Sequence, residues 1–360
     1  MNWKEQLRLS LDWSYIEQIF PTCNTCRSFP VQITPHYAQL LSKNLDTSLN
    51  KIVLPAKEEK QADGSLDSMN ENADYKIHGL QHRYPDTVLL MVSEMCASHC
   101  RFCFRRRIFD SENFVDEKIK NINDIVFYLK AHTEINNVLL SGGDPFVNSN
   151  EIILNILEAI ININHIKYVR IGTKILAYLP QRITEEPEFI SKLKELNKKK
   201  PILIVTHFDH YKEVSTETIE AIRMFNCAGL KLLSQTTLLK GINDNVETMK
   251  QLFETFIAYN IFPYYIFQTM PAKGATHYQV KFVDAIKLIN DFSINLSGLG
   301  KSFRYIIPHN SGKIEAIGYD SNYFYFKYHR SRDPLKTGKL LKIPFDLERV
   351  WFEKEEIIFL

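Results

Sequence analysis

Three cysteines lie close together in the stretch CASHCRFC, where Cys96, Cys100 and Cys103 have the spacing C-x3-C-x2-C. Three thiolates can hold three irons of a [4Fe–4S] cluster and leave the fourth iron open. A closed zinc site or a simple electron carrier uses four protein ligands, and no fourth cysteine follows nearby. The spacing therefore predicts a cluster that binds a substrate at its open iron. Three incidental thiols or part of a zinc site are the alternative.

A glycine pair and an acid come one expected strand after the cysteines: Gly142, Gly143 and Asp144. Two glycines after a strand usually mark only a tight turn. Because of their place in the chain, we expect these residues to let the backbone approach a bound amine or ribose beside the cluster.

A later expected strand ends in His207, Asp209 and His210. Their spacing is compatible with a metal site, but the sequence offers no further acidic or histidine partner. We expect them to form hydrogen bonds at the rim of the site instead.

Two further features each have an ordinary and a functional interpretation. Cys23 and Cys26 form C-x2-C, which is half of a zinc site, but no second pair exists and two ordinary thiols are favoured. Lys313 lies in an expected turn, where a lysine is a surface residue by default. A lysine folded back over the site could form a Schiff base with pyridoxal phosphate, and the pattern alone does not choose.

Short apolar runs alternate with longer amphipathic stretches, which predicts parallel strands joined by helices. The expected strands are Val88–Val92, Asn137–Leu140, Tyr168–Ile171, Ile202–Thr206, Lys231–Thr236 and Pro263–Gln268. The expected helices lie near 115–132, 149–163, 187–199, 215–228, 244–259 and 280–294. The fold class is α/β, a partial (β/α)6 TIM-like barrel whose polar residues gather at the carboxyl ends of the strands, where such barrels carry their sites.

Different patterns flank this core and predict three parts of the chain. Residues 1–78 form an N-terminal helical extension followed by a polar linker or surface segment from residue 55. Residues 79–300 form the barrel, and residues 301–360 form a strand-rich C-terminal segment. The expected strands of that last part are Ser302–Ile307, Lys313–Ile317 and Tyr323–Tyr328.

Composition limits the function classes. The chain has 360 residues, 45% of them hydrophobic, so it can bury a large core. The formal net charge of +2 gives no indication of a nucleic-acid or membrane partner. No apolar run is long enough to span a bilayer, and Met1 to Ser10 lack the apolar region of a signal peptide. Six cysteines without a disulfide framework favour a reducing cytoplasm.

Together, these residues resemble the radical S-adenosylmethionine superfamily and, within it, the lysine 2,3-aminomutase family. The resemblance runs in order from Gln81 to Lys313 and is weak outside that range. The matching motifs are HRYPD, CASHCRFCFRRRIF, LLSGGDP, RIGTK, LPQRIT, THFDH, LSQTTLLKGINDN, PYYIFQ and SGLGKSFRYIIPHNSGK.

The resemblance implies a reaction and its cofactors. A [4Fe–4S] cluster would bind S-adenosylmethionine and cleave it to a 5′-deoxyadenosyl radical, which takes a hydrogen from the β-carbon of an amino acid held on pyridoxal 5′-phosphate. The amino group then moves from Cα to Cβ. A flavodoxin- or ferredoxin-type electron donor and a small amino-acid substrate are the implied partners, and a homodimer is a further expectation.

The family's functional residues fall on matching positions of this chain. The cluster ligands match the three cysteines, and Arg105 matches the arginine that grips the substrate carboxylate. The residues matched to S-adenosylmethionine are Gly142, Gly143, Asp144, His207 and Gln235, and those matched to pyridoxal phosphate are Lys313, Arg83 and Tyr84.

Departures from the family pattern indicate a different substrate. Lysine mutases hold the substrate ammonium with two aspartates, where this chain has Met270 and Ile306. Burying a cation without a counter-charge is costly, so the expected substrate is not free lysine. Lys273 and Arg304 lie near these positions, with Arg304 on the strand face of Ile306, which suggests an acidic, neutral or larger side chain.

Other departures affect the cofactor and leave alternatives. Thr87 replaces an arginine that helps to hold pyridoxal phosphate, and Asn245 stands where the family has a zinc-binding cysteine. The first alternative is another radical reaction on the same scaffold, such as dehydrogenation, epimerisation or modification of a peptide-bound residue. The second is a non-catalytic iron–sulfur protein.

Overall fold

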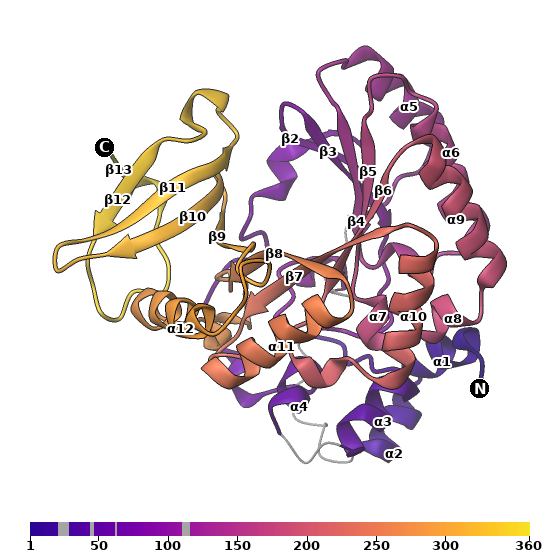
Figure 1. The fold of residues 1–360 in the computed structure, drawn as a ribbon, viewed down its shortest axis with the longest axis horizontal. Coiled ribbons are helices and arrows are strands. Elements are labelled where there is room, and N and C mark those ends of the chain that lie inside the picture. Colours follow the sequence, from indigo (N-terminus) through magenta and orange to yellow (C-terminus); the bar gives the residue numbers. More distant parts are fainter. Residues whose placement is uncertain (21–28, 44–46, 62, 110–115) are drawn as a thin grey trace.

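A computed structural model describes residues 1–20, 29–43, 47–61, 63–109 and 116–360. Cys23 and Cys26, the half zinc site of the sequence, lie outside the described residues. Figure 1 shows a central set of strands with helices α5, α6, α9 and α10 along one side and β10 to β13 on the opposite side.

The predicted partial (β/α)6 barrel is confirmed, because six strands pair in parallel and in sequence order. The strands are β3 (Thr87–Ser93), β4 (Asn137–Gly142), β5 (Tyr168–Thr173), β6 (Ile202–His207), β7 (Lys231–Leu238) and β8 (Ile261–Gln268). The helices between and after them are α5 (Ile122–Ala131), α6 (Asn150–Ile161), α7 (Ile175–Tyr178), α8 (Gln181–Thr184), α9 (Pro187–Lys199), α10 (Thr216–Cys227), α11 (Val246–Ala258) and α12 (Phe282–Ile294).

Local sequence fixes where the connecting helices begin. Ser215 caps α10, where its side chain accepts from the Thr218 amide at 3.2 Å. Asn245, which stands at the family's zinc-cysteine position, instead caps α11 by accepting from the Thr248 amide at 2.9 Å. Such side-chain caps satisfy amides that the first helical turn leaves unpaired.

The C-terminal part continues the barrel sheet before it turns away. β9 (Arg304–His309) pairs in parallel with β8, so a seventh parallel strand follows the predicted six. The remaining strands pair antiparallel: β10 (Gly312–Tyr319), β11 (Tyr323–Ser331), β12 (Leu340–Pro344) and β13 (Ile358–Phe359). Gly312 has φ +152°, and a Cβ there would lie 2.2 Å from the Arg330 carbonyl oxygen. This close approach sets the position of the next residue, Lys313.

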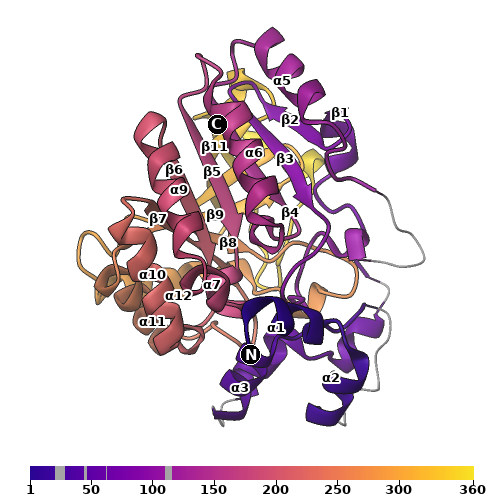
Figure 2. The same ribbon diagram turned by 90° about the vertical axis from the view of Figure 1, so that its right-hand side faces the viewer.

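A set of helices lies near the N-terminus, in the range where the sequence predicts a helical extension. It contains α1 (Trp3–Ser10), α2 (Trp13–Ile19), α3 (Pro35–Lys43) and α4 (Thr47–Val53). α1, α2 and α3 gather at one end of the strands (Figure 2), and Figure 1 shows α4 near them at the same end. β1 (Tyr75–Ile77) and β2 (Leu80–Tyr84) then form a hairpin that pairs antiparallel with β3.

The polar segment after residue 55 packs more closely than the linker or surface segment expected from its composition. Glu59 is buried and forms ion pairs with Arg101 at 2.5 Å and Arg106 at 2.7 Å. Glu71 is buried and pairs with Arg105 at 2.7 Å. Buried arginines need counter-charges, and these acids supply them. The segment is therefore attached to the arginines that follow the cysteines.

None of the helices in the described ranges is both long and apolar enough to cross a membrane.

Candidate functional site

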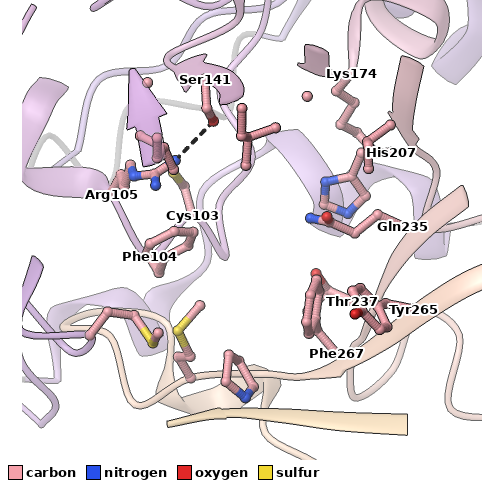
Figure 3. A pocket seen from close by; sticks show the side chains of 18 of the residues that line it. Cys103, Phe104, Arg105, Ser141, Lys174, His207, Gln235, Thr237, Tyr265 and Phe267 are labelled. Carbon is pink, nitrogen blue, oxygen red and sulfur yellow. Dashed lines mark hydrogen bonds between the residues drawn. The ribbon is translucent and has the colours of Figure 1, made fainter. Parts of the chain in front are cut away.

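One cavity lies at the carboxyl ends of the barrel strands and brings most of the predicted site residues together (Figure 3). Its lining includes Cys96, Cys100, Cys103, Gly142, Gly143, Asp144, His207, Gln235, Arg83, Tyr84, Arg105, Met270 and Lys313. In Figure 3, Cys103, Phe104 and Arg105 face Lys174, His207 and Gln235 across the open space. Residues far apart in the sequence thus share one site.

The cysteine loop is held by the N-terminal extension. The Arg101 amide donates to the Ile52 carbonyl at 2.7 Å, and the Gln32 side chain donates to the Cys96 carbonyl at 2.6 Å. Burial raises the pKa of each of the three thiols. A bound metal favours the thiolate form of its ligands and so lowers their pKa. The raised pKa values therefore describe the three cysteines with no metal bound.

The glycine pair lets β4 end directly against the cysteine loop. A Cβ on Gly142 would lie 2.4 Å from the Ser93 carbonyl oxygen, and one on Gly143 would lie 2.2 Å from that of Met95. Both distances are below any real Cβ contact, so only glycine fits. The Gly143 and Asp144 amides donate to these carbonyls at 2.7 Å each. The glycines therefore bring Asp144 next to Cys96.

Asp144 is oriented by its own neighbours. Its carboxylate accepts from the Thr173 hydroxyl and the Lys174 amide, both at 2.8 Å, and from the Phe146 amide at 3.0 Å. Burial raises the pKa of this carboxyl above its ordinary value. The two carboxylate oxygens are already bonded, which fixes the orientation of the group beside the cavity.

A charged group lies at the rim where the sequence predicts hydrogen bonding. His207 Nε2 lies 2.8 Å from Asp209 Oδ1, and Lys174 Nζ lies 2.7 Å from Asp209 Oδ2 and 2.9 Å from Glu213 Oε1. His207 and Gln235 are register partners on β6 and β7. Lys174 was missed as a site residue, although a lysine directly after the apolar strand β5 is a signal that could have found it.

Lys313 faces the other end of the cavity. Its Nζ lies 4.5 Å from the ring centroid of Tyr265. Burial, and then the charges of Arg170, Arg330 and Arg83, lower its pKa from 10.5 to about 7. Lys313 therefore lies in the cavity wall with a lowered pKa, and not on the surface with an ordinary one.

Two arginines beside Lys313 were not singled out from the sequence. Arg170 is a charged residue inside the apolar strand β5, which was a usable signal. Its Nη2 donates to Asn137 Oδ1 at 2.6 Å, and its buried Nε has no hydrogen-bond partner among the described residues. Arg330 comes from β11, pairs with the Asp86 carboxylate, donates to the Thr87 hydroxyl at 3.2 Å, and stacks on the Tyr84 ring at 4.5 Å. A guanidinium thus lies beside Thr87, where the family's own arginine is missing.

The residues predicted for the substrate carboxylate and side chain separate into two groups. Arg105 lines the cavity, donates to the Ser141 hydroxyl at 3.2 Å and is held by Glu71. Met270 also lines the cavity. Ile306, Lys273 and Arg304 do not belong to its lining. Ile306 is fully buried elsewhere, Lys273 is exposed, and Arg304 is exposed at the start of β9, where Glu315 pairs with it at 2.8 Å.

Comparisons with known proteins agree with this geometry. The family model "Radical SAM superfamily" matches residues 90–253. A protein of Aquifex aeolicus named for L-lysine 2,3-aminomutase is 35% identical over 357 residues, which are 97% of this chain and 95% of that protein. The L-lysine 2,3-aminomutase of Fusobacterium nucleatum is 35% identical over 86% of this chain and 72% of its own length.

Solved structures are more distant. A radical SAM methyltransferase of Sphaerobacter thermophilus has a TM-score of 0.41 and 15% identity over 63% of this chain and 68% of that chain. At that distance the likeness carries no argument. The family assignment rests on the sequence relatives. Membership of the radical SAM superfamily implies a [4Fe–4S] cluster and S-adenosylmethionine, and the three cysteines in one cavity wall fit that cluster. The chain belongs to the lysine 2,3-aminomutase family of radical S-adenosylmethionine enzymes.

Proposed function

We propose that this protein is a pyridoxal-phosphate-dependent 2,3-aminomutase that acts on an amino acid other than free lysine. The observation that carries the proposal is that the wall of one cavity contains both the three cysteines and Lys313 with its arginines. A reaction that passes a hydrogen between a nucleoside radical and an amino acid needs both groups in one enclosed space.

Different residues of the cavity would hold the cluster, the substrate carboxylate and pyridoxal phosphate. When bound, the cluster with S-adenosylmethionine supplies radical chemistry, and pyridoxal phosphate supplies the π-system that permits amino migration. Cys96, Cys100 and Cys103 would hold the cluster, and Arg105 would orient the substrate carboxylate with the N–H groups that Glu71 leaves open. Lys313 would offer a neutral amine.

The residues around Lys313 fit pyridoxal phosphate despite the loss at Thr87. Arg330 lies against that threonine, and the Arg170 Nε lacks a partner within the described part of the chain, so both could face a phosphate. Arg83 Nε donates to Asp74 Oδ2 at 2.6 Å, and this ion pair fixes the arginine side chain in the cavity wall. Arg83 and Arg330 are each paired with a carboxylate, Asp74 and Asp86, so a phosphate would share these two guanidinium groups with the acids and would take the open Nε of Arg170.

Charge in the cavity supports a substrate that is not lysine. Among the described lining residues the carboxylates are Glu71 and Asp144, and both are fully engaged. A substrate ammonium would find no free counter-charge there. Met69, Phe104 and Met270 instead offer apolar contacts, which favours a neutral side chain.

Electron supply, assembly and location complete the proposal. A flavodoxin- or ferredoxin-type protein would deliver the electron, and the cytoplasm suits an oxygen-sensitive cluster. A homodimer, detected by light scattering of the reconstituted enzyme, would agree with the family expectation.

The proposal is tested by anaerobic incubation of reconstituted enzyme with S-adenosylmethionine, reductant and a set of amino acids, followed by mass spectrometry. A β-amino isomer of a neutral amino acid, lost in Lys313→Ala and retained in Lys301→Ala, is expected. β-Lysine as the main product would contradict the substrate proposal.

The same experiment separates the alternatives. 5′-Deoxyadenosine without any β-isomer would indicate another radical reaction on this scaffold. Neither product, from enzyme with full iron content, would indicate a non-catalytic iron–sulfur protein.

A further inference from the structure

A tyrosine outside the family's matched residues contacts one of the three cysteines. Tyr178 ends the short helix α7, is 2% exposed, and its hydroxyl lies 2.9 Å from Cys100 Sγ. In the cluster-bound protein Cys100 is a thiolate and can only accept, so the hydroxyl is the donor.

This donor differs in kind from those of the other two cysteines. Backbone amides of Asp144 and Arg105 face Cys96 and Cys103, respectively, although the Asp144 amide also donates to the Met95 carbonyl at 2.7 Å. Backbone amides remain when a side chain is changed. Cys100 alone among the three has a side-chain hydroxyl as its donor within the described residues. Its hydrogen bond can therefore be removed by a single substitution.

The position of the hydroxyl is tightly set. Tyr37 packs edge-on against the Tyr178 ring, with centroids 4.9 Å apart and an interplanar angle of 83°. Lys174 Nζ lies 5.2 Å from the same ring centroid. The Tyr178 carbonyl accepts a hydrogen bond from the Thr34 hydroxyl. With its ring and backbone both held, Tyr178 has no room to turn away from the sulfur.

We propose that Tyr178 tunes the reduction potential of the cluster by donating a hydrogen bond to the Cys100 thiolate. Reduction adds one electron, taken from a low-potential one-electron donor, and leaves more negative charge on the cluster and its sulfurs. A donor at the sulfur stabilises that reduced state and raises the potential. No bond breaks, and the proton stays on the tyrosine. The proposal depends on the cluster and is independent of the substrate or pyridoxal phosphate.

The test is a redox titration of the reconstituted enzyme, followed by the electron paramagnetic resonance signal of the reduced cluster. Tyr178→Phe should lower the equilibrium constant for reduction about tenfold, a shift of about 59 mV to more negative potential for one electron. Tyr37→Phe is the matched control, because its hydroxyl donates to Glu213 at 3.0 Å and forms no hydrogen bond with any of the described cysteines. Its potential should stay within about a twofold change in the same constant.

Two results would overturn the proposal: an unchanged potential in Tyr178→Phe, or equal shifts in both variants. A second measurement applies if Tyr178→Phe holds too little cluster to titrate. Wild-type enzyme exchanged into D2O should then show a deuteron coupled to the reduced cluster in pulsed resonance spectra, beyond those of slowly exchanging amides. Absence of that rapidly exchanging deuteron would equally refute the hydrogen bond.

Discussion

Lys313 should capture pyridoxal 5′-phosphate as a neutral amine near neutral pH. Its pKa is lowered from 10.5 to about 7, first by burial and then by the charges of Arg170, Arg330 and Arg83. A lysine with an ordinary pKa of about 10.4 is neutral in roughly one molecule in 2,500 at pH 7, whereas a pKa of about 7 leaves about half of the molecules neutral. The pH dependence of capture therefore reports the environment of this side chain.

The assay follows the visible band of lysine-bound pyridoxal phosphate after it is mixed with cofactor-free protein. The initial rate of band formation with the protein is divided by the rate with acetyl-lysine amide at the same pH. Both reactions use the same aldehyde, so the effect of its ionisation cancels and the ratio reports the neutral fractions of the two amines. The neutral fraction of Lys313 rises about fivefold from pH 6 to 7 and then levels off, while that of the free amine keeps rising about tenfold per unit. The ratio should be level below pH 6 and fall about tenfold per unit above pH 8.

Variants test whether the pH dependence of capture comes from Lys313 and from the charge beside it. Lys313→Arg should abolish the band, and Lys301→Arg, at an exposed position, should not change it. Arg170→Gln should move the midpoint to higher pH, because it removes the charge that ranks next after burial. A ratio that stays constant from pH 6 to 9.5 would show that Lys313 titrates like an exposed lysine and would refute the reasoning.

Three further predictions concern neighbouring features. Arg330→Met should weaken the affinity for pyridoxal phosphate about tenfold, measured by fluorescence titration, while the affinity for pyridoxal without phosphate changes little; equal losses would argue against a phosphate contact. Glu59→Gln should lower the free energy of unfolding in a denaturant titration by about 3–5 kcal/mol, because it leaves two buried arginines without their counter-charge, and a loss below about 1 kcal/mol would contradict that. Gly143→Ala should lower the bound iron per chain, since its Cβ would meet the Met95 carbonyl oxygen at 2.2 Å, whereas Gly298→Ala, with nothing within 4 Å, should bind iron normally.

The sequence by itself was enough to predict the barrel and one end of its site. Each predicted barrel strand overlaps an observed one, because alternating apolar and amphipathic runs are local signals. The cysteine spacing and the glycine pair are also local, and their places at strand ends put them at one rim. Boundaries shifted by a few residues, and the seventh parallel strand, β9, was assigned to the C-terminal segment because strand partners are not encoded locally.

Only the tertiary structure decided how distant charges pair and which residues share the cavity. Glu59 and Glu71 belong to a segment that looks like a linker by composition, yet they are buried against the arginines after the cysteines. Arg330 is hydrogen-bonded to Thr87, which lies 243 positions away in the sequence, and Tyr178 to Cys100, which lies 78 positions away. Such contacts depend on strand order, register and helix packing, which no window of sequence contains. The cysteine triad was therefore predictable from spacing, whereas its hydrogen-bond donor and the arginines around Lys313 became visible only in the folded chain.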